Sequence, residues 1–267
     1  MDFSFNETQL EVQKLANQIL VDQTSNERQN QIDTQDDRFD EELWAALAQA
    51  GLLGTAFSED NGGMGFGFTE LCLFIEEVGR TVAAVPVVPV IVSAGLAIQQ
   101  FGSKEQQQRL LPAVAAGKTL ITAGLCEALA ECPAHPTSTA VKDGDAYTLN
   151  GTKIAVPFAH KAERILVTAK VGNALGLFLL DPQASGVALT RQVSTAHEPW
   201  FEVAMTDAVV AASDVLLVSE EGAAAAQWIS ERTMAALCAM QVGITDESTK
   251  ITAAFTCERE QFGQPIG

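Results

Sequence analysis

The sequence has few of the residues that mark metal sites or disulfide-stabilised folds. Its 267 residues include five cysteines and three histidines. The spacing of His135, His160 and His197 fits no metal-ligand pattern with one another or with a cysteine pair, so we expect no metal. An odd number of scattered cysteines is typical of reduced thiols in a cytoplasm.

Long apolar segments are also missing. The apolar stretch at residues 82–96 contains Pro86 and Pro89 and is too short to cross a bilayer. The N-terminus has no basic region and no cleavage pattern, which predicts that there is no export signal. These features favour a cytoplasmic protein.

Positive charge is scarce. The sequence has sixteen lysines and arginines but 34 aspartates and glutamates, which gives a net charge of −18 and an isoelectric point near 4.4. A surface this negative repels nucleic acid and anionic membranes, so we exclude both as partners. It also opposes an anionic substrate at long range, unless the cations gather at a local site.

Residues 1–118 have the patterns of helices. Two capping boxes, Asn6 to Gln9 and Ser103 to Gln106, each precede an apolar stripe. Asp40 is placed to cap another helix, and residues 86–101 predict an apolar helix. The polar residues 25–37 predict a loop, and residues 61–67 form a glycine-rich loop.

Residues 119–218 have the pattern of a β-domain. Short β-rich runs occur at residues 120–127, 146–149, 153–156, 164–169, 176–180 and 186–190. The dipeptides Asp143-Gly144 and Asn150-Gly151 are typical of hairpin turns. Six or more such runs predict a small sandwich or barrel.

Residues 219–267 return to a helical pattern. Trp228, Ala235, Cys238 and Val242 recur at roughly helical spacing, so we expect this face to be buried. The sequence offers no following segment to cover it. We therefore expect the first helices of a C-terminal helical bundle, left incomplete, and an oligomer that covers the exposed face.

Three stretches together resemble the acyl-CoA dehydrogenase family of flavoproteins. They are residues 60–65 with 76–80, residues 147–153, and the ending Arg-Glu-Gln-Phe-Gly-Gln-Pro-Ile-Gly at 259–267. The likeness covers the whole chain in the right order. It implies an α+β multidomain protein with an N-terminal all-α domain (1–118), a middle β-sandwich or barrel domain (119–218) and the start of a helical domain (219–267).

The resemblance implies oxidation of the α–β bond of an acyl-CoA, with a carboxylate base and FAD as the hydride acceptor. Glu231 matches the position from which some members take the base, and a desolvated carboxyl group there would have a raised pKa. Arg232 beside it would bind substrate. The plainer alternative is a helix-surface carboxylate next to a solvated arginine.

Arg259, Gln261 and Phe262 match family positions that reach the FAD of a neighbouring subunit. An arginine suits a pyrophosphate because its planar guanidinium donates two parallel hydrogen bonds. The plainer alternative is a surface arginine with Phe262 as a packing residue.

The β-domain departs from the family pattern. Cys126 and Cys132 stand where members have threonine and serine hydroxyls, and residues 155–157 read Ala-Val-Pro in place of Trp-Ile-Thr. Thiols are weak donors, and Pro157 has no N–H to give. Each lost hydrogen bond costs about 1–2 kcal/mol, so several together would weaken FAD binding by orders of magnitude.

Two functions follow from these residues. The first is an acyl-CoA dehydrogenase that passes electrons to an electron-transfer flavoprotein, with Glu231 as base. The second is a non-catalytic subunit of a heteromeric dehydrogenase that completes a partner's FAD site. A fragment of a longer protein is a third possibility, and the sequence does not choose between a homo- and a hetero-oligomer.

Overall fold

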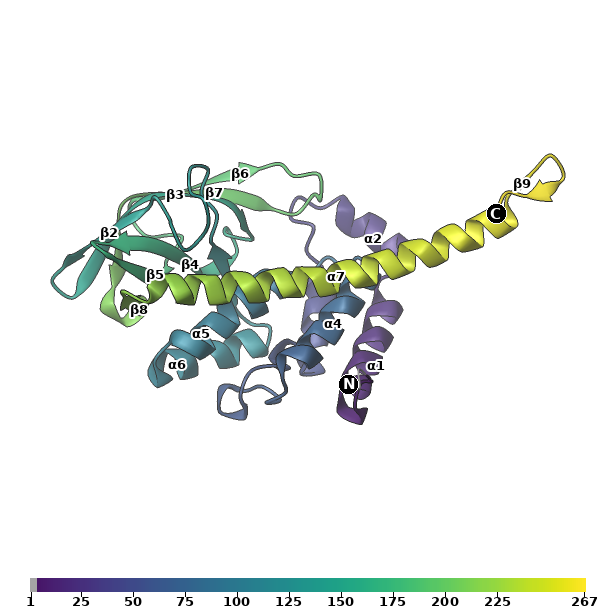
Figure 1. Ribbon diagram of the computed structural model, residues 1–267, viewed down its shortest axis with the longest axis horizontal. Helices are drawn as coiled ribbons and strands as arrows, with labels where there is room; N and C mark the ends of the chain where they lie inside the picture. The colour runs from purple at the N-terminus through teal and green to yellow at the C-terminus, as the bar shows by residue number, and fades with distance from the viewer. Residues whose placement is uncertain (1–3) are drawn as a thin grey trace.

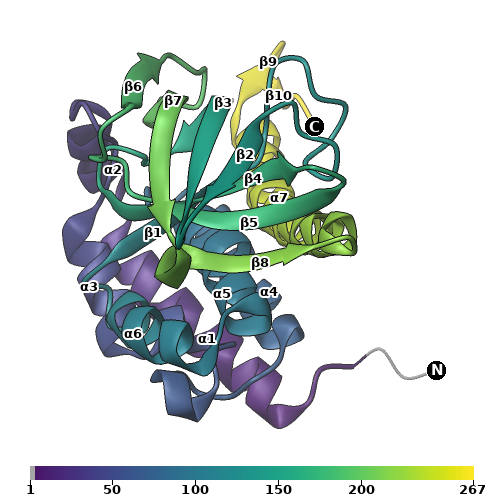
Figure 2. The ribbon, with the colours of Figure 1, turned by 90° about the vertical axis from the view of Figure 1, so that its left-hand side faces the viewer.

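A computed structural model describes residues 4–267 of the chain (Figures 1 and 2). An N-terminal layer of helices packs against a β-domain, and one long C-terminal helix crosses both before it extends away from them. The predicted order of helical domain, β-domain and helix is confirmed.

Residues 4–118 contain six α-helices, several of which are capped by local side chains. Asn6 and Ser103 form the two predicted capping boxes, and Asp40 accepts from the backbone N–H of Leu43 at 3.0 Å. The helices are α1 (Glu7–Gln23), α2 (Asn26–Asp33), α3 (Glu41–Gln49), α4 (Phe68–Arg80), α5 (Leu96–Phe101) and α6 (Lys104–Ala115). Short 3₁₀ turns, η1 (Leu52–Gly54) and η2 (Glu59–Asn61), connect α3 to the glycine-rich loop.

One local prediction in this region is wrong, and another is confirmed with a different helix type. The predicted loop at residues 25–37 contains helix α2, which Ser25 caps by accepting from the N–H of Arg28. This helix has little apolar pattern because it buries only Ile32. The predicted helix at residues 86–101 is confirmed as helical, with a π-helix, η3 (Val88–Gly95), that continues directly into α5.

The β-domain is one mixed sheet of eight strands in the order β6-β7-β3-β2-β4-β5-β8, with β1 paired to β4. Three strands were not expected from the sequence, β2, β7 and β8. The strands are β1 (Leu120–Gly124), β2 (Thr139–Asp143), β3 (Ala146–Pro157), β4 (Ala162–Val171), β5 (Ala174–Leu180), β6 (Val187–Gln192), β7 (Trp200–Ala211) and β8 (Val215–Ser219).

Only one of the two predicted hairpin turns exists. The first lies at a real turn, in which Gly144 and Asp145 connect β2 to β3, whose residues pair from Asp143–Ala146 to Thr139–Asn150. Asn150 and Gly151 do not turn the chain, because β3 continues through them with a register shift against β7. Gly151 has a φ of +144°, and a Cβ atom there would overlap Ser138, so the dipeptide makes a bulge rather than a hairpin.

The C-terminal helix α7 (Gly222–Glu258) has 37 residues and is about 55 Å long at 1.5 Å per residue. The apolar face for which the sequence offers no covering segment is not the face that packs on the body. Ala235, Cys238 and Val242 are exposed and Trp228 is half-buried. The buried residues of α7 are instead Gly222, Ala225, Ala226, Ile229, Ala236 and Gly243.

One large apolar core joins the helical layer to one side of the sheet and to the first half of α7, and a smaller core lies within the sheet. The expected domain divisions at 118/119 and 218/219 fall between α6 and β1 and at the last residue of β8. The division into domains stays a prediction. Within residues 4–267, no helix is long and apolar enough to cross a membrane.

Candidate functional site

The residues matched to a neighbour's FAD lie together at the end of α7. Arg259 is the C-cap of α7, and the hairpin that follows pairs β9 (Glu260–Gln261) with β10 (Gln264–Pro265). The turn residues Phe262 and Gly263 have φ values of +55° and +77°, as a two-residue type I′ turn requires. The structure therefore brings Arg259, Gln261 and Phe262 into one small unit.

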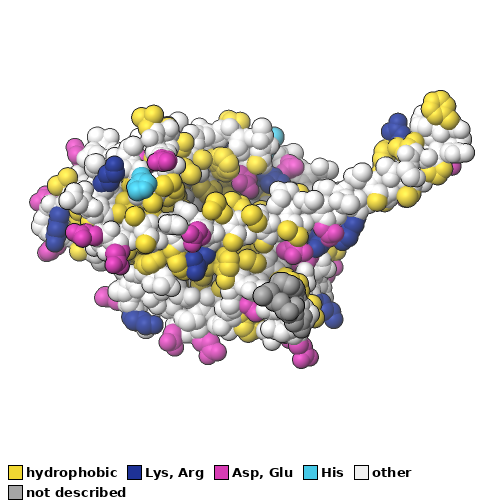
Figure 3. Space-filling model, viewed as in Figure 1, with side chains coloured by type: hydrophobic (Ala, Val, Ile, Leu, Met, Phe, Trp, Pro, Cys, Tyr) yellow, Lys and Arg dark blue, Asp and Glu magenta, His cyan; other side chains and the backbone are white. Residues whose placement is uncertain are grey.

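This unit, the α7 arm (residues 247–267), extends beyond the body of the molecule (Figure 1). The side chain of Phe262 is fully exposed, at 106% of its reference area. The guanidinium of Arg259 lies 5.5 Å from the ring centroid of Phe255, and both side chains are exposed. Apolar side chains are therefore gathered at the end of the arm, as Figure 3 shows.

Glu231 and Arg232 lie far from the arm, near the start of α7. Glu231 is exposed, and its carboxylate accepts a hydrogen bond of 2.8 Å from the side chain of Gln227. Arg232 is half-buried with its guanidinium carbon 3.6 Å from the ring centroid of Trp228. Burial lowers the pKa of Arg232, although the charge of Glu231 opposes this shift.

Glu231, the candidate base, lies far from Arg259, the candidate FAD-binding residue. Glu231 and Arg259 are 28 residues apart on one continuous helix, which is about 42 Å at 1.5 Å per residue. A single flavin pocket cannot contain both groups from the same chain. The structure thus separates the candidate catalytic pair from the candidate cofactor-binding group.

A buried ion pair, which the sequence reasoning missed, organises the loop that follows β1. The ammonium of Lys153 lies 2.5 Å from the carboxylate of Glu127, and their side chains are 0% and 2% exposed. Lys153 also donates to the hydroxyl of Thr168 at 3.1 Å. The available signal was a lysine within a predicted strand of the β-domain, where an inward-facing charge requires a buried partner.

Glu127 holds the far end of the same loop. Its carboxylate accepts from the backbone N–H groups of Thr137 at 2.5 Å and Ser138 at 3.2 Å. Burial alone would raise the pKa of Glu127, but hydrogen bonds from Lys153, Thr137 and Ser138 outweigh it and lower the pKa to about 2. Residues 127 and 137 are therefore held together, and the loop between them carries Cys132.

The strand positions matched to the flavin ring have few free hydrogen-bond donors. The backbone N–H of Ala155 donates to the side-chain oxygen of Gln192 at 2.8 Å. Pro157 has no N–H, and its carbonyl accepts from the hydroxyl of Thr122 at 2.7 Å. Gln192 also escaped the sequence reasoning, because it lies on a different strand, β6.

Cys126 is a further position that the family likeness matches to the flavin site. Its thiol is exposed, and its backbone bonds to Ile154, whose N–H donates to the carbonyl of Cys126 at 2.9 Å. A flavin ring and its pyrophosphate require strong donors, whereas Cys126 offers a thiol, Pro157 has no N–H and the N–H of Ala155 is already bonded. The residues at these positions do not fit an FAD bound in the β-domain of this chain.

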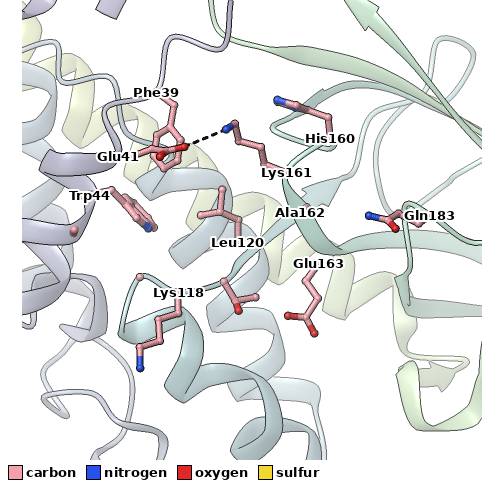
Figure 4. Close-up of a pocket in the computed structure, with 13 residues that line it drawn as sticks. Phe39, Glu41, Trp44, Lys118, Leu120, His160, Lys161, Ala162, Glu163 and Gln183 are labelled. Carbon is pink, nitrogen blue, oxygen red and sulfur yellow. Dashed lines mark hydrogen bonds and ion pairs between the residues drawn. The ribbon is translucent and has the colours of Figure 1, made fainter.

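A cavity of about 500 Å³ lies at the seam between the helical part and the β-domain (Figure 4). Its walls carry charges of both signs, and Lys161 lies 3.2 Å from Glu41. The indole N–H of Trp44 is buried beside it without a hydrogen-bond partner. None of the predicted site residues lines this cavity.

A second cavity of about 510 Å³ lies between α4, the loop before β7 and α7. It is lined by apolar side chains including Val82 and Met240, together with His197 and Glu198. Glu231 and Arg232 are not among its lining residues. In residues 4–267, no three His, Cys, Asp or Glu side chains are grouped to hold a metal ion.

Comparison with known proteins identifies the family that has this fold. A sequence profile of the N-terminal domain of acyl-CoA dehydrogenases matches residues 6–118. The solved structure of the ChsE4-ChsE5 complex from Mycobacterium tuberculosis superposes with a TM-score of 0.93 and 30% identity over 100% of this chain and 71% of that one. A variant of the Tcur3481-Tcur3483 steroid acyl-CoA dehydrogenase superposes with a TM-score of 0.89 and 38% identity, over 98% and 70%. The fold is that of the acyl-CoA dehydrogenases.

The sequence comparison agrees. Acyl-CoA dehydrogenase FadE27 of Mycobacterium tuberculosis is 31% identical over 100% of this chain and 69% of its own length. The chain belongs to the acyl-CoA dehydrogenase family, a family of flavoprotein oxidoreductases. It spans about two thirds of the length of the curated relatives that it matches.

Proposed function

We propose that this chain is a cytoplasmic subunit of a heteromeric acyl-CoA dehydrogenase and that its α7 arm completes the FAD site of a partner subunit. The observation that carries the proposal is the placement of Arg259, Gln261 and Phe262. All three are exposed at the end of α7 and on the hairpin that follows it, which extend away from the body of their own chain. A side chain on such an arm reaches another molecule more readily than its own β-domain.

The β-domain supports the same assignment. Its candidate flavin surface lacks strong donors, because Gln192 occupies the N–H of Ala155 and Pro157 has none. In this proposal the partner supplies a complete β-domain, and Arg259 of this chain donates to the pyrophosphate of that partner's FAD. The FAD then carries out the redox chemistry, while this chain binds and orients it.

Two of the structural relatives are consistent with a heteromer. One is a complex of ChsE4 with ChsE5, and the other pairs Tcur3481 with Tcur3483 as a steroid acyl-CoA dehydrogenase. We accordingly propose an acyl-CoA of a fatty acid or a steroid side chain as the substrate of the complex. An electron-transfer flavoprotein is the proposed electron acceptor.

A second candidate function is catalysis by this chain, with Glu231 as the base and Arg232 as a substrate-binding residue. The observation that favours it is the packing of Arg232 on Trp228, which holds a half-buried positive charge next to a carboxylate. The exposure of Glu231 counts against it, because a base at a reacting centre works in a site from which water is excluded.

An affinity-tagged chain purified from its native host tests the proposal. We expect a second acyl-CoA dehydrogenase subunit to co-purify and the complex to contain FAD. The variant Arg259→Ala should weaken FAD binding by roughly 10- to 100-fold, as expected for a lost hydrogen bond to a charged group. Arg109→Ala, which removes an exposed arginine on α6, is the matched control. Equal FAD affinity in both variants would contradict the proposal.

A further inference from the structure

Four charged side chains meet at the point where α7 leaves the body. Arg80, the last residue of α4, donates to Glu77 at 3.0 Å and to Glu76 at 2.8 Å. Its guanidinium also bonds to Asp246 of α7. Of the hydrogen bonds that join α7 to another helix within residues 4–267, the bond between Arg80 and Asp246 is the nearest to the C-terminal end of α7.

The same cluster extends to α1. Glu77 is almost fully buried, with 3% of its side chain exposed. Its two carboxylate oxygens accept from Gln13 at 3.1 Å and from Asn17 at 2.7 Å, both on α1. Through Glu77 and Arg80, the helices α1 and α4 are therefore both connected to the base of the α7 arm.

Two glycines fix the helix crossing beside this cluster. A Cβ atom added to Gly79 of α4 would overlap the backbone carbonyl of Met240, and one added to Gly243 of α7 would overlap the carbonyl of Glu76. The two backbones are thus in direct contact, with no flexible side chain between them. Such a contact determines where α7 crosses α4, and the ion pair one turn later determines in which direction it continues.

The arm is a lever. From Asp246 to Glu258 the helix continues for 12 residues, which is about 18 Å. A tilt of about 5° at Asp246 would move the end of such a lever by roughly 1.6 Å. A displacement of this size is enough to disturb the binding of a cofactor or the alignment of reacting groups.

We propose that Arg80 and Asp246 are positioning residues, which hold the α7 arm in the direction that places Arg259 and Phe262 at the partner's FAD. This inference rests on the function proposed above. Neither residue touches the FAD. Both act through the direction of the helix.

Substitution of Asp246 tests the positioning role with little disturbance of the core, because this side chain is partly exposed. Its side chain is 43% exposed, and its other partner is Lys250, at 2.8 Å. Asp246→Asn removes the charge that Arg80 binds and keeps the size of the side chain. Asp246→Glu restores the charge and is the conservative rescue. Lys250→Gln removes the other partner of Asp246 and is the matched control.

The direction of the arm is measured first, in the isolated full-length chain. A spin label on the exposed Cys257 and a second on Glu11→Cys of α1, with the other four cysteines replaced by serine, give a distance distribution between arm and body. We expect a narrow distribution for the wild-type background and for Lys250→Gln. Asp246→Asn should shift and widen it, and Asp246→Glu should restore it.

The second measurement is the affinity of the complete complex for FAD. Asp246→Asn should weaken it roughly tenfold while the complex still assembles, since a small displacement of positioned groups has effects of this size. An unchanged distance distribution in Asp246→Asn would overturn the positioning role. An FAD affinity that falls with Arg259→Ala but not with Asp246→Asn would also overturn the positioning role. That result would leave the proposed function intact. If neither variant changes FAD affinity, the proposed function fails as well.

Discussion

The backbone N–H of Ala155 is occupied by the side-chain oxygen of Gln192, at 2.8 Å. Ala155 lies on β3, where the family likeness places residues against a flavin ring, and Gln192 is the last residue of β6. A ligand at this position would have to displace Gln192 to reach the donor. The N–H of Ala155 is therefore hydrogen-bonded within the β-domain itself. Phe262 on the α7 arm, in contrast, is fully exposed to solvent.

Phe262→Ala should weaken FAD binding by the complex without lowering the stability of the chain. The side chain is fully exposed, so its removal costs no core packing, whereas against a flavin it would bury aromatic surface. We expect a loss of roughly 5- to 10-fold in FAD affinity, equivalent to about 1–1.5 kcal/mol. Flavin fluorescence titration of the complex measures the affinity, and Phe66→Ala, another exposed phenylalanine, serves as the control.

Glu127→Gln should destabilise the β-domain strongly. The variant leaves the buried ammonium of Lys153 without a negative partner, a change that typically costs about 3–5 kcal/mol. Urea unfolding followed by circular dichroism measures the loss. Glu131→Gln, on the same loop but exposed, should unfold at the wild-type midpoint. Equal midpoints for the two variants would show that the buried pair contributes little.

The same pair predicts how stability depends on pH. The folded pKa of Glu127 is about 2, below the ordinary value of about 4.3 for an unfolded chain. Its contribution is therefore complete above the unfolded pKa and is lost as pH falls toward the folded pKa. The stability difference between wild type and Glu127→Gln should shrink between about pH 5 and pH 3. A constant difference over that window would contradict the assigned pKa.

Gly243→Ala should lower stability although alanine is the better helix former. The added methyl group would overlap the carbonyl of Glu76, and overpacking of this kind costs about 1–3 kcal/mol. Thermal unfolding of the chain measures the effect. Ser248→Ala, an exposed position on the same helix, should change the melting temperature little or raise it slightly. A stabilised Gly243→Ala variant would mean that the two helices do not cross in contact.

Glu231→Gln separates the two candidate functions. If the partner supplies catalysis, the complex should keep its rate of acyl-CoA oxidation within about twofold, because an exposed carboxylate outside the reacting centre contributes little to the transition state. Steady-state kinetics with an artificial electron acceptor measure the rate. A loss of several orders of magnitude would instead make Glu231 the base and this chain the catalytic subunit.

Much of the fold was predictable because its signals are local. The capping boxes at Asn6 and Ser103 and the turn between Asp143 and Ala146 depend on residues within four positions of each other. The wrong predictions depend on distant contacts. Asn150-Gly151 has the composition of a hairpin, but it forms a bulge because β3 pairs with β7, some 60 residues away.

The site was predictable only in part, for the same reason. The motif at residues 259–262 is local, so its residues lie close together, but the hairpin formed by residues 260–265 was not predicted. The occupation of Ala155 by Gln192 and the pairing of Glu127 with Lys153 join residues 37 and 26 positions apart. Nor does helical periodicity show which face of α7 packs on the body, because alanines and glycines rather than large apolar residues make that contact.

The flavin content of the purified chain, alone and with its partner, tests the account most directly. The absorption spectrum of each sample in the flavin bands gives the amount of FAD per chain. We predict a colourless isolated chain, and a yellow complex that contains less FAD when Arg259 is replaced by alanine. An isolated chain that purifies as a yellow monomer with tightly bound FAD would contradict the proposal that this chain contributes only part of a shared pocket.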